Sequence, residues 1–256
     1  MADRRWLEMT WRDGLFAHWA VDPATVAATL PDRLSVATHG GDAYLGVVPF
    51  VMADIRPRGL PVGLSFAELN LRTYVDGPNG PGVYFYSLDA DDRLGVAVAR
   101  GLFRLPYYRA ETEVAREPTA TGRSDAAAVD GGPAASDGGA PVSDRGAVRF
   151  TSRRVHEGAP HARFDATYRP VGEAFTPDAG SLAAFLLENY RFYTAGSDGA
   201  LYAGAIAHEP WTLRPAAADI RANTLFSANG FDRPAGDPTL HYADPIAVTA
   251  DRLRRV

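Results

Sequence analysis

Residues 65–90 constrain the fold of this chain most strongly, because they predict a β-hairpin whose first strand has two chemically different faces. Successive side chains of a strand point to opposite sides of its sheet. One side is therefore expected to carry the aliphatic residues Ala67, Leu69, Leu71 and Val75. The other side is expected to carry the aromatic and polar residues Phe66, Glu68, Asn70, Arg72 and Tyr74. Charged and amide groups are costly to bury unless they are paired or hydrated, so this second face predicts the wall of a wet cavity.

Strand patterns also cover most of the remaining chain. Residues 41–55 predict a long buried strand in which Pro49 marks an edge or a bulge. Further strands are expected within residues 13–21, 107–117, 148–155, 162–170, 200–216 and 245–256. The chain has 256 residues, of which 46% are hydrophobic, and can bury one large core. We therefore expect residues 1–256 to form a single α+β domain with mostly β structure.

Three segments carry helix signals. Residues 21–34 predict a short helix with Asp22 as its N-cap, Pro23 in its first position and Pro31 after its end. Residues 91–103 predict a helix that is opened by two aspartates. The clearest helix is expected within residues 177–196 and ends at Gly196. Its apolar positions recur at helical spacing and are Leu182, Phe185, Leu186, Tyr190 and Tyr193.

A low-complexity stretch interrupts the strand patterns at about residues 116–147. It is rich in Ala, Gly, Ser and Asp and has almost no large apolar side chain, so it cannot offset its own ordering entropy by burial. The strand pattern resumes directly after it. We therefore expect an insertion loop within one domain, with residues 118–145 poorly ordered or lying on the surface.

Composition excludes several classes of protein. The chain contains no Cys, which rules out disulfides and thiolate chemistry, and no Lys, which rules out a side-chain Schiff base and a Walker-A loop. A net charge of −5 argues against a nucleic-acid partner. No apolar run is long enough to span a membrane, and the charged N-terminus does not resemble a signal peptide, so we expect a cytoplasmic protein. The six histidines show no close pairing, so neither a metal nor a cofactor is expected.

The candidate site residues each have two interpretations. Glu68 and Arg72 form either a surface ion pair or, together with Asn70, the polar part of a cavity. His208 and Trp211, in the run His-Glu-Pro-Trp, are either structural or in contact with a ligand. Tyr190 either packs in the core or reaches a ligand with its hydroxyl group. Tyr107 and Tyr108 must point to opposite sides of a strand, so at most one of them faces a given cavity.

Eight segments, in order and spacing, resemble the YqjF-like family, whose domain has no known function. They cover nearly the whole chain except the insertion, and they are VDPATVAATLPDRL, AYLGVVPF, RPRGLP, FAELNLRTYV, GVYFYSLDA, LFRLPYYRAE, SLAAFLLENYRFY and HEPWTLRPA. That family is grouped with the acetoacetate decarboxylase superfamily. The resemblance implies a closed, cone-like (double-psi-like) β-barrel around an internal cavity, with a few flanking helices.

The resemblance also implies that this chain lacks the reactive lysines of the decarboxylase. The decarboxylase carries a Gly-Arg-Glu-x-x-Gly-x-Pro-Lys-Lys run, and the segment ARGLFRLPYY is similar to it in frame. The match places Arg100 on the arginine and Tyr107 and Tyr108 on the two lysines, while Glu68 falls more loosely on a cavity glutamate. In the decarboxylase one lysine forms an imine with the substrate. A phenol cannot form an imine, so this chain is not expected to be a Schiff-base decarboxylase.

Three functions remain open on sequence grounds. The first is a protein that binds a small aromatic or carboxylate-bearing molecule in an aromatic-lined cavity, with Arg72 or Arg100 holding its polar group. The second is a cofactor-free lyase, isomerase or hydrolase in which Tyr107 or Tyr108 and Glu68 transfer protons. The third is a structural or interaction protein whose interior is filled by side chains.

Overall fold

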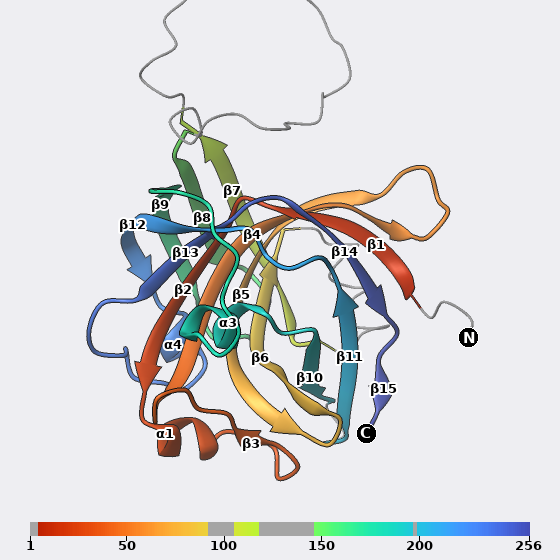
Figure 1. The fold of residues 1–256 in the computed structure, drawn as a ribbon, viewed down its shortest axis with the longest axis vertical. Coiled ribbons are helices and arrows are strands. Elements are labelled where there is room, and N and C mark those ends of the chain that lie inside the picture. The colour runs from red at the N-terminus through yellow and green to blue at the C-terminus, as the bar shows by residue number, and fades with distance from the viewer. Residues whose placement is uncertain (1–4, 92–104, 118–145, 197–198) are drawn as a thin grey trace, which may run out of the picture.

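The computed structural model describes residues 5–91, 105–117, 146–196 and 199–256 (Figure 1). Residues 118–145, which make up most of the insertion predicted at about 116–147, therefore lie outside the described residues. So do nearly all of the helix predicted at 91–103 and the candidate residue Arg100. Figure 1 shows that strands are the main element of the described molecule and that its helices are short. The predicted mostly-β fold is confirmed.

The 15 strands of the described residues form one hydrogen-bonded sheet. They are β1 (Arg5–Arg12), β2 (Gly14–Val21), β3 (Ser35–Val36), β4 (Ala43–Pro57), β5 (Leu64–Gly77), β6 (Gly80–Ala90), β7 (Tyr107–Arg116), β8 (Val148–Arg154), β9 (Arg163–Pro170), β10 (Arg191–Ala195), β11 (Leu201–Ala207), β12 (Leu213–Asn223), β13 (Thr239–Ala243), β14 (Ile246–Asp251) and β15 (Arg254–Arg255). Their order is β1-β14-β11-β10-β6-β7-β8-β9-β12-β13-β2-β4-β5-β3, and β15 pairs with β11. Additional pairings of β1 with β4 and of β5 with β6 join strands that are distant in this order.

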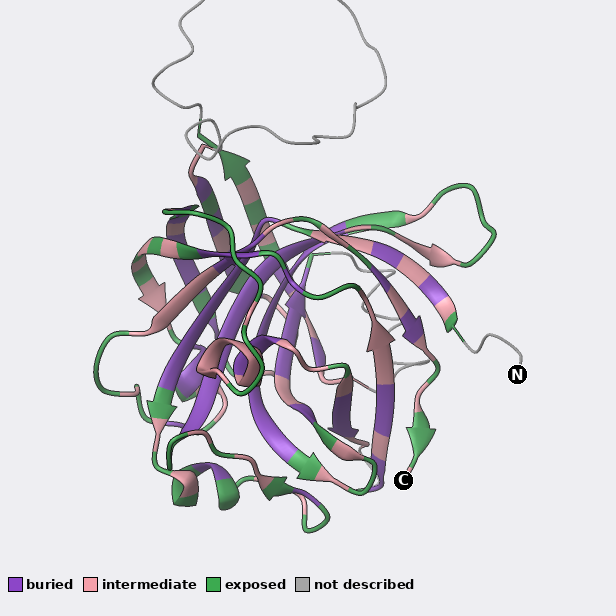
Figure 2. Ribbon diagram, in the orientation of Figure 1, coloured by how far each residue is buried: buried purple, intermediate pink, exposed green. Residues whose placement is uncertain are grey.

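The predicted hairpin is confirmed in position and in the orientation of its faces. Strands β5 and β6 pair in antiparallel register from Gly77 and Gly80 at the turn to Glu68 and Ala90 at the far end. Ala67, Leu69 and Leu71 of the aliphatic face pack into an apolar core that includes Phe150 of β8, and Val75 packs in a smaller separate cluster. The mixed face of β5 lies against a different core. Figure 2 shows β5 buried along most of its length, because both of its faces are covered.

Pro49 lies in the interior of β4 and marks neither an edge nor a bulge, contrary to expectation. It pairs in register with Leu69 of β5, and the irregularity of this ladder occurs further on, between Met52 and Ile55. On the other side of β4, the β2 ladder ends at Val47 and the β1 ladder begins at Val51. Proline is tolerated here because β4 changes partner at this point, so the missing N–H breaks no ladder on that side.

The prediction of a long helix within residues 177–196 is also mostly wrong. Helix α3 covers only Leu182–Leu187, and Glu188 leaves the helical conformation with φ −83° and ψ 59°. The residues after Tyr190 form β10, in which Phe192 pairs with Val83 of β6. Aromatic and β-branched side chains favour a strand, and pairing with β6 and β11 overrides the helical spacing of the tyrosines. Gly196 consequently belongs to the β10–β11 turn.

Two further helices lie in the described chain. Helix α1 (Pro23–Ala27) has the predicted N-cap, since Oδ1 of Asp22 accepts the N–H of Ala24 at 2.8 Å. It ends before Pro31. Helix α4 (Leu225–Ala228) and the strands β1 and β13 were not predicted from the sequence. Among the described residues, no helix has the length and apolar content needed to cross a membrane.

Candidate functional site

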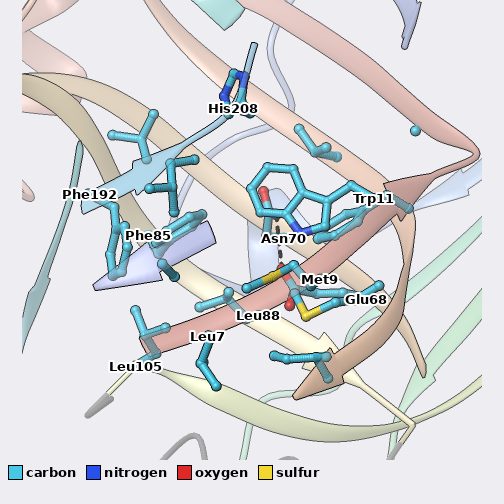
Figure 3. Close-up of a pocket in the computed structure, with 18 of the residues that line it drawn as sticks. Leu7, Met9, Trp11, Glu68, Asn70, Phe85, Leu88, Leu105, Phe192 and His208 are labelled. Carbon is cyan, nitrogen blue, oxygen red and sulfur yellow. Dashed lines mark hydrogen bonds between the residues drawn. The ribbon is translucent and has the colours of Figure 1, made fainter. Parts of the chain in front are cut away.

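A cavity of about 260 Å³ lies against the mixed face of β5 (Figure 3). Most of its wall is apolar and comes from strands that are far apart in the sequence. Representative wall residues are Leu7 and Met9 of β1, Phe50 of β4, Phe85 and Leu88 of β6, and Phe192 of β10. Such an apolar wall with a few converging polar groups is typical of small-molecule sites.

The polar groups of the cavity come from alternate positions of β5. Glu68, Asn70 and Arg72 line it with exposed fractions of only 3%, 3% and 9%. The Tyr107 hydroxyl donates a hydrogen bond to Oε2 of Glu68 at 2.6 Å, and the Asn70 amide donates to Oε1 at 3.3 Å. Figure 3 shows Glu68 and Asn70 together among apolar side chains. The carboxyl group is therefore held by neutral donors, not by a salt bridge.

Burial controls the protonation of Glu68. Removal from water raises the pKa of its carboxyl group to about 7, even though the bonds from Tyr107 and Asn70 and the charge of Arg72 lower it. The same burial, together with the neighbouring Glu68, raises the pKa of the Tyr107 hydroxyl well above its ordinary value. Tyr107 thus remains a hydrogen-bond donor, and Glu68 is the group of this pair that titrates near neutral pH.

We expect this raised pKa to make stability depend on pH. Because folded Glu68 binds its proton more tightly than in the unfolded chain, its stabilisation is complete at acid pH and is lost as the pH rises from about 4.5 through about 7. Relative to the wild type, Glu68→Gln should gain about 3 kcal/mol in free energy of unfolding across this range. Urea titrations at several pH values measure the difference. Glu113→Gln, at an exposed position of β7, is the control, and a difference independent of pH would contradict the prediction.

Arg72 is the third polar residue of this row on β5. Its guanidinium carbon is 5.1 Å from the centre of the Phe16 ring and 5.8 Å from that of Tyr74. One terminal nitrogen donates to the carbonyl of Leu186 at 3.4 Å, and the Nε–H has no partner in the part of the chain that the structure describes. Within the described chain no carboxylate forms an ion pair with Arg72. The guanidinium is therefore held by aromatic contacts and by the Leu186 carbonyl, and its Nε–H remains available to a ligand.

His208 lines the cavity with its ring. Its Nδ1 lies 2.7 Å from the Glu209 carbonyl oxygen, which can only accept, so Nδ1–H is the donor of this hydrogen bond. The ring is packed between Tyr190 and Trp211, with centroid distances of 4.6 and 4.9 Å. Its Nε2 is buried without a partner in the described structure. The same is true of Nε1 of Trp11 and Oδ1 of Asn70, which also line the cavity.

The other predicted site residues, Tyr108, Trp211 and Tyr190, have different environments. Tyr108 points away from the cavity, and the guanidinium carbon of Arg154 lies 4.0 Å from the centre of its ring. Trp211 lines the cavity, but its indole N–H is taken by the carbonyl of Leu187 at 3.0 Å. Tyr190 is partly exposed; its hydroxyl donates to Glu188 and its ring supports His208. Among the described residues, no group of three or more His, Asp or Glu side chains could hold a metal ion.

Sequence reasoning missed the contribution of β1. Leu7, Met9 and Trp11 all face the cavity, and Figure 3 shows them side by side along this strand. Their spacing of two residues, with Glu8 and Thr10 between them, was a usable strand signal. Trp11 matters most, because it supplies an unpartnered donor to the site.

The fold defines a class of proteins that is already known from solved structures. The described structure is similar to an acetoacetate decarboxylase-like enzyme from Sphingomonas wittichii RW1, with a TM-score of 0.60, 14% identity and coverage of 100% of this chain and 94% of that one. It is also similar to the enduracididine biosynthesis enzyme MppR complexed with pyruvate, with a TM-score of 0.61, 14% identity and coverage of 100% and 91%. These similarities establish an acetoacetate decarboxylase-like fold.

Within this class the sequence belongs to one family. Residues 8–247 match the family DUF2071, described as an uncharacterized conserved protein. The chain is 38% identical over 252 residues to the uncharacterized protein YqjF of Bacillus subtilis (strain 168), covering 97% of this chain and 92% of that protein. The chain is therefore a member of the DUF2071 family, and the predicted resemblance is confirmed.

Proposed function

We propose that this protein binds, without a covalent bond, a small molecule that has a carboxylate on an apolar or aromatic body. The observation that carries this proposal is the buried guanidinium of Arg72, which lines an apolar cavity without a carboxylate partner in the described chain. A buried charge is costly to leave unpaired. A ligand carboxylate supplies the missing charge and accepts from the fork of N–H donors.

The rest of the cavity suits such a ligand. The aromatic and aliphatic wall residues favour an apolar body. The orphan groups of Trp11, Asn70 and His208 can satisfy further polar atoms. A solved structure of the same fold holds pyruvate, itself a small carboxylate. Because this chain has no lysine, its side chains cannot hold such a molecule as an imine.

We also infer that the cavity is the interior of a closed, cone-like barrel. The support is the pairing of β1 with both β14 and β4, and of β6 with both β5 and β10, which joins the strands around the cavity into a circuit. A closed wall would separate the bound molecule from bulk water, and this would strengthen the contact between Arg72 and a carboxylate.

The test compares carboxylates with their amides. Calorimetric titration of the purified full chain with phenylacetate, benzoate and 4-methyl-2-oxopentanoate should show binding of at least one acid and a much weaker response to its amide. Arg72→Met should weaken that binding by roughly 10- to 150-fold, the range expected for hydrogen bonds to charged groups. Arg221→Met removes a half-exposed arginine that pairs with Asp165 and Asp219, and should leave binding unchanged. Equal binding of acid and amide, or unaltered binding by Arg72→Met, would refute the carboxylate anchor.

A further inference from the structure

The cavity contains an acid where a simple carboxylate-binding site would have none. Glu68 and Arg72 lie on the same face of β5 with Asn70 between them, and both line the same cavity. An ionised Glu68 would repel the proposed ligand carboxylate and lower its affinity. The two hydrogen bonds that hold the Glu68 carboxyl group are therefore best explained by a role in chemistry on the bound molecule.

The geometry points to Glu68 as a general base that removes a proton from the carbon next to the carbonyl of a bound 2-oxo acid, so that the cavity enolises this substrate. This inference rests on the proposed function, because Arg72 is assigned to the carboxylate of the same molecule. Tyr107 is a positioning residue. Its hydroxyl holds Oε2 of Glu68 at 2.6 Å and leaves Oε1, which has only the longer contact with Asn70, for the C–H group.

The step balances without a further reactant. A Glu68 oxygen forms an O–H bond as the C3–H bond of the substrate breaks, and that electron pair becomes the C2–C3 double bond. The carbonyl π electrons move onto the oxygen, which becomes an enolate. Return of a proton from Glu68 to C3 restores the 2-oxo acid, and exchange of the Glu68 proton with solvent replaces hydrogen by deuterium in D₂O.

An enolate oxygen needs hydrogen-bond donors that are in place before the reaction. Two N–H groups that line the cavity have no partner among the described residues, namely Nε1 of Trp11 and Nε of Arg72. Both groups are donors only, so a negative oxygen satisfies them better than a ground-state ligand does. The unpartnered donors and the buried carboxyl group are thus complementary to an enolate.

Proton NMR in D₂O tests this activity with 4-methyl-2-oxopentanoate, which has two C3 hydrogens and a branched apolar tail. The wild type should exchange one of the two hydrogens much faster than the other, whereas buffer exchanges both equally. Glu68→Gln should lower this selective rate by about 100-fold or more, the usual contribution of a general base. Tyr108→Phe, on the opposite side of β7, should exchange like the wild type. Thermal melting establishes that each variant is folded.

The dependence of the exchange rate on pH provides a second readout. The wild-type exchange rate should rise with pH through about 7, as Glu68 becomes a carboxylate. Among the described residues, the charged or titratable groups that act on Glu68 are Tyr107 of β7, Arg72 of β5 and Asp89 of β6. Tyr107→Phe removes a bond that favours the charged form of Glu68, so it should move the midpoint of the profile to higher pH. A merely structural tyrosine would not shift this midpoint.

The outcomes separate this inference from the proposed function. If 4-methyl-2-oxopentanoate binds but exchanges only at the buffer rate, or if Glu68→Gln exchanges like the wild type, the enolisation is refuted and carboxylate binding stands. If phenylacetate binds and the 2-oxo acid does not, the substrate class is wrong. If none of the acids binds, the proposed function itself fails.

Discussion

Replacing Asp89 by Asn should lower the free energy of unfolding by about 3–5 kcal/mol, the usual cost of removing one partner from a buried ion pair. Asp89 of β6 and Arg154 of β8 have side chains that are each 1% exposed. Two parallel hydrogen bonds join them, at 2.6 Å from Nε and 2.9 Å from a terminal nitrogen. The variant would leave the Arg154 charge buried beneath the ring of Tyr108 without its carboxylate. Equilibrium denaturation in urea measures the loss.

A neighbouring ion pair, which also includes an arginine of β8, provides the control. Arg153 of β8 contacts Glu111 of β7, and both side chains are 65% exposed. Glu111→Gln should cost only about 0–1 kcal/mol, because water screens exposed pairs. Arg154→Met should be costly as well, and less so at acid pH, because burial raises the pKa of Asp89 and a protonated Asp89 no longer needs the guanidinium. A loss below about 1 kcal/mol for Asp89→Asn would show that water reaches this pair.

Replacing Phe164 by Ala should lower the free energy of unfolding by a similar amount, about 3–5 kcal/mol, because it removes a large buried ring and leaves a void. Phe164 of β9 is fully buried and packs edge-on against Phe150 at a centroid distance of 6.2 Å. Both rings belong to the core beneath the aliphatic face of β5. Denaturant titration, with the slope compared to that of the wild type, measures the change.

The core that contains Phe164 lies on the side of β5 away from the cavity, so Phe164→Ala should affect stability but not binding. Because the cavity lies against the opposite face of β5, the folded Phe164→Ala protein should keep the carboxylate binding proposed for the wild type. Val62→Ala changes a side chain that is 78% exposed, and should alter stability by no more than about 0.5 kcal/mol. A large loss of binding in folded Phe164→Ala would show that the two sides of the sheet are energetically coupled.

Local patterns predicted those elements whose pairing partners are close in the sequence. The β5–β6 hairpin follows from its alternation and its Gly-Pro-Asn-Gly turn, and the N-cap of α1 follows from Asp22 and Pro23. The helix expected within 177–196 failed because helical spacing of tyrosines is only a weak local preference. Strand pairing of Phe192 with Val83, which is remote in the chain, overrides it.

For the candidate site, the sequence alone determined which chemistry is possible. The absence of lysine excludes a side-chain imine, and the alternation of β5 places Glu68, Asn70 and Arg72 on one face, since strand geometry has a strict period of two. Tertiary structure alone decided that this face borders a cavity and that Tyr107, not Tyr108, reaches Glu68. It also brought Trp11 and His208, from opposite ends of the chain, to the same cavity. The two-residue alternation along a strand shows which side chains share a face. The environment of that face depends on strands that pair with it across long sequence separations.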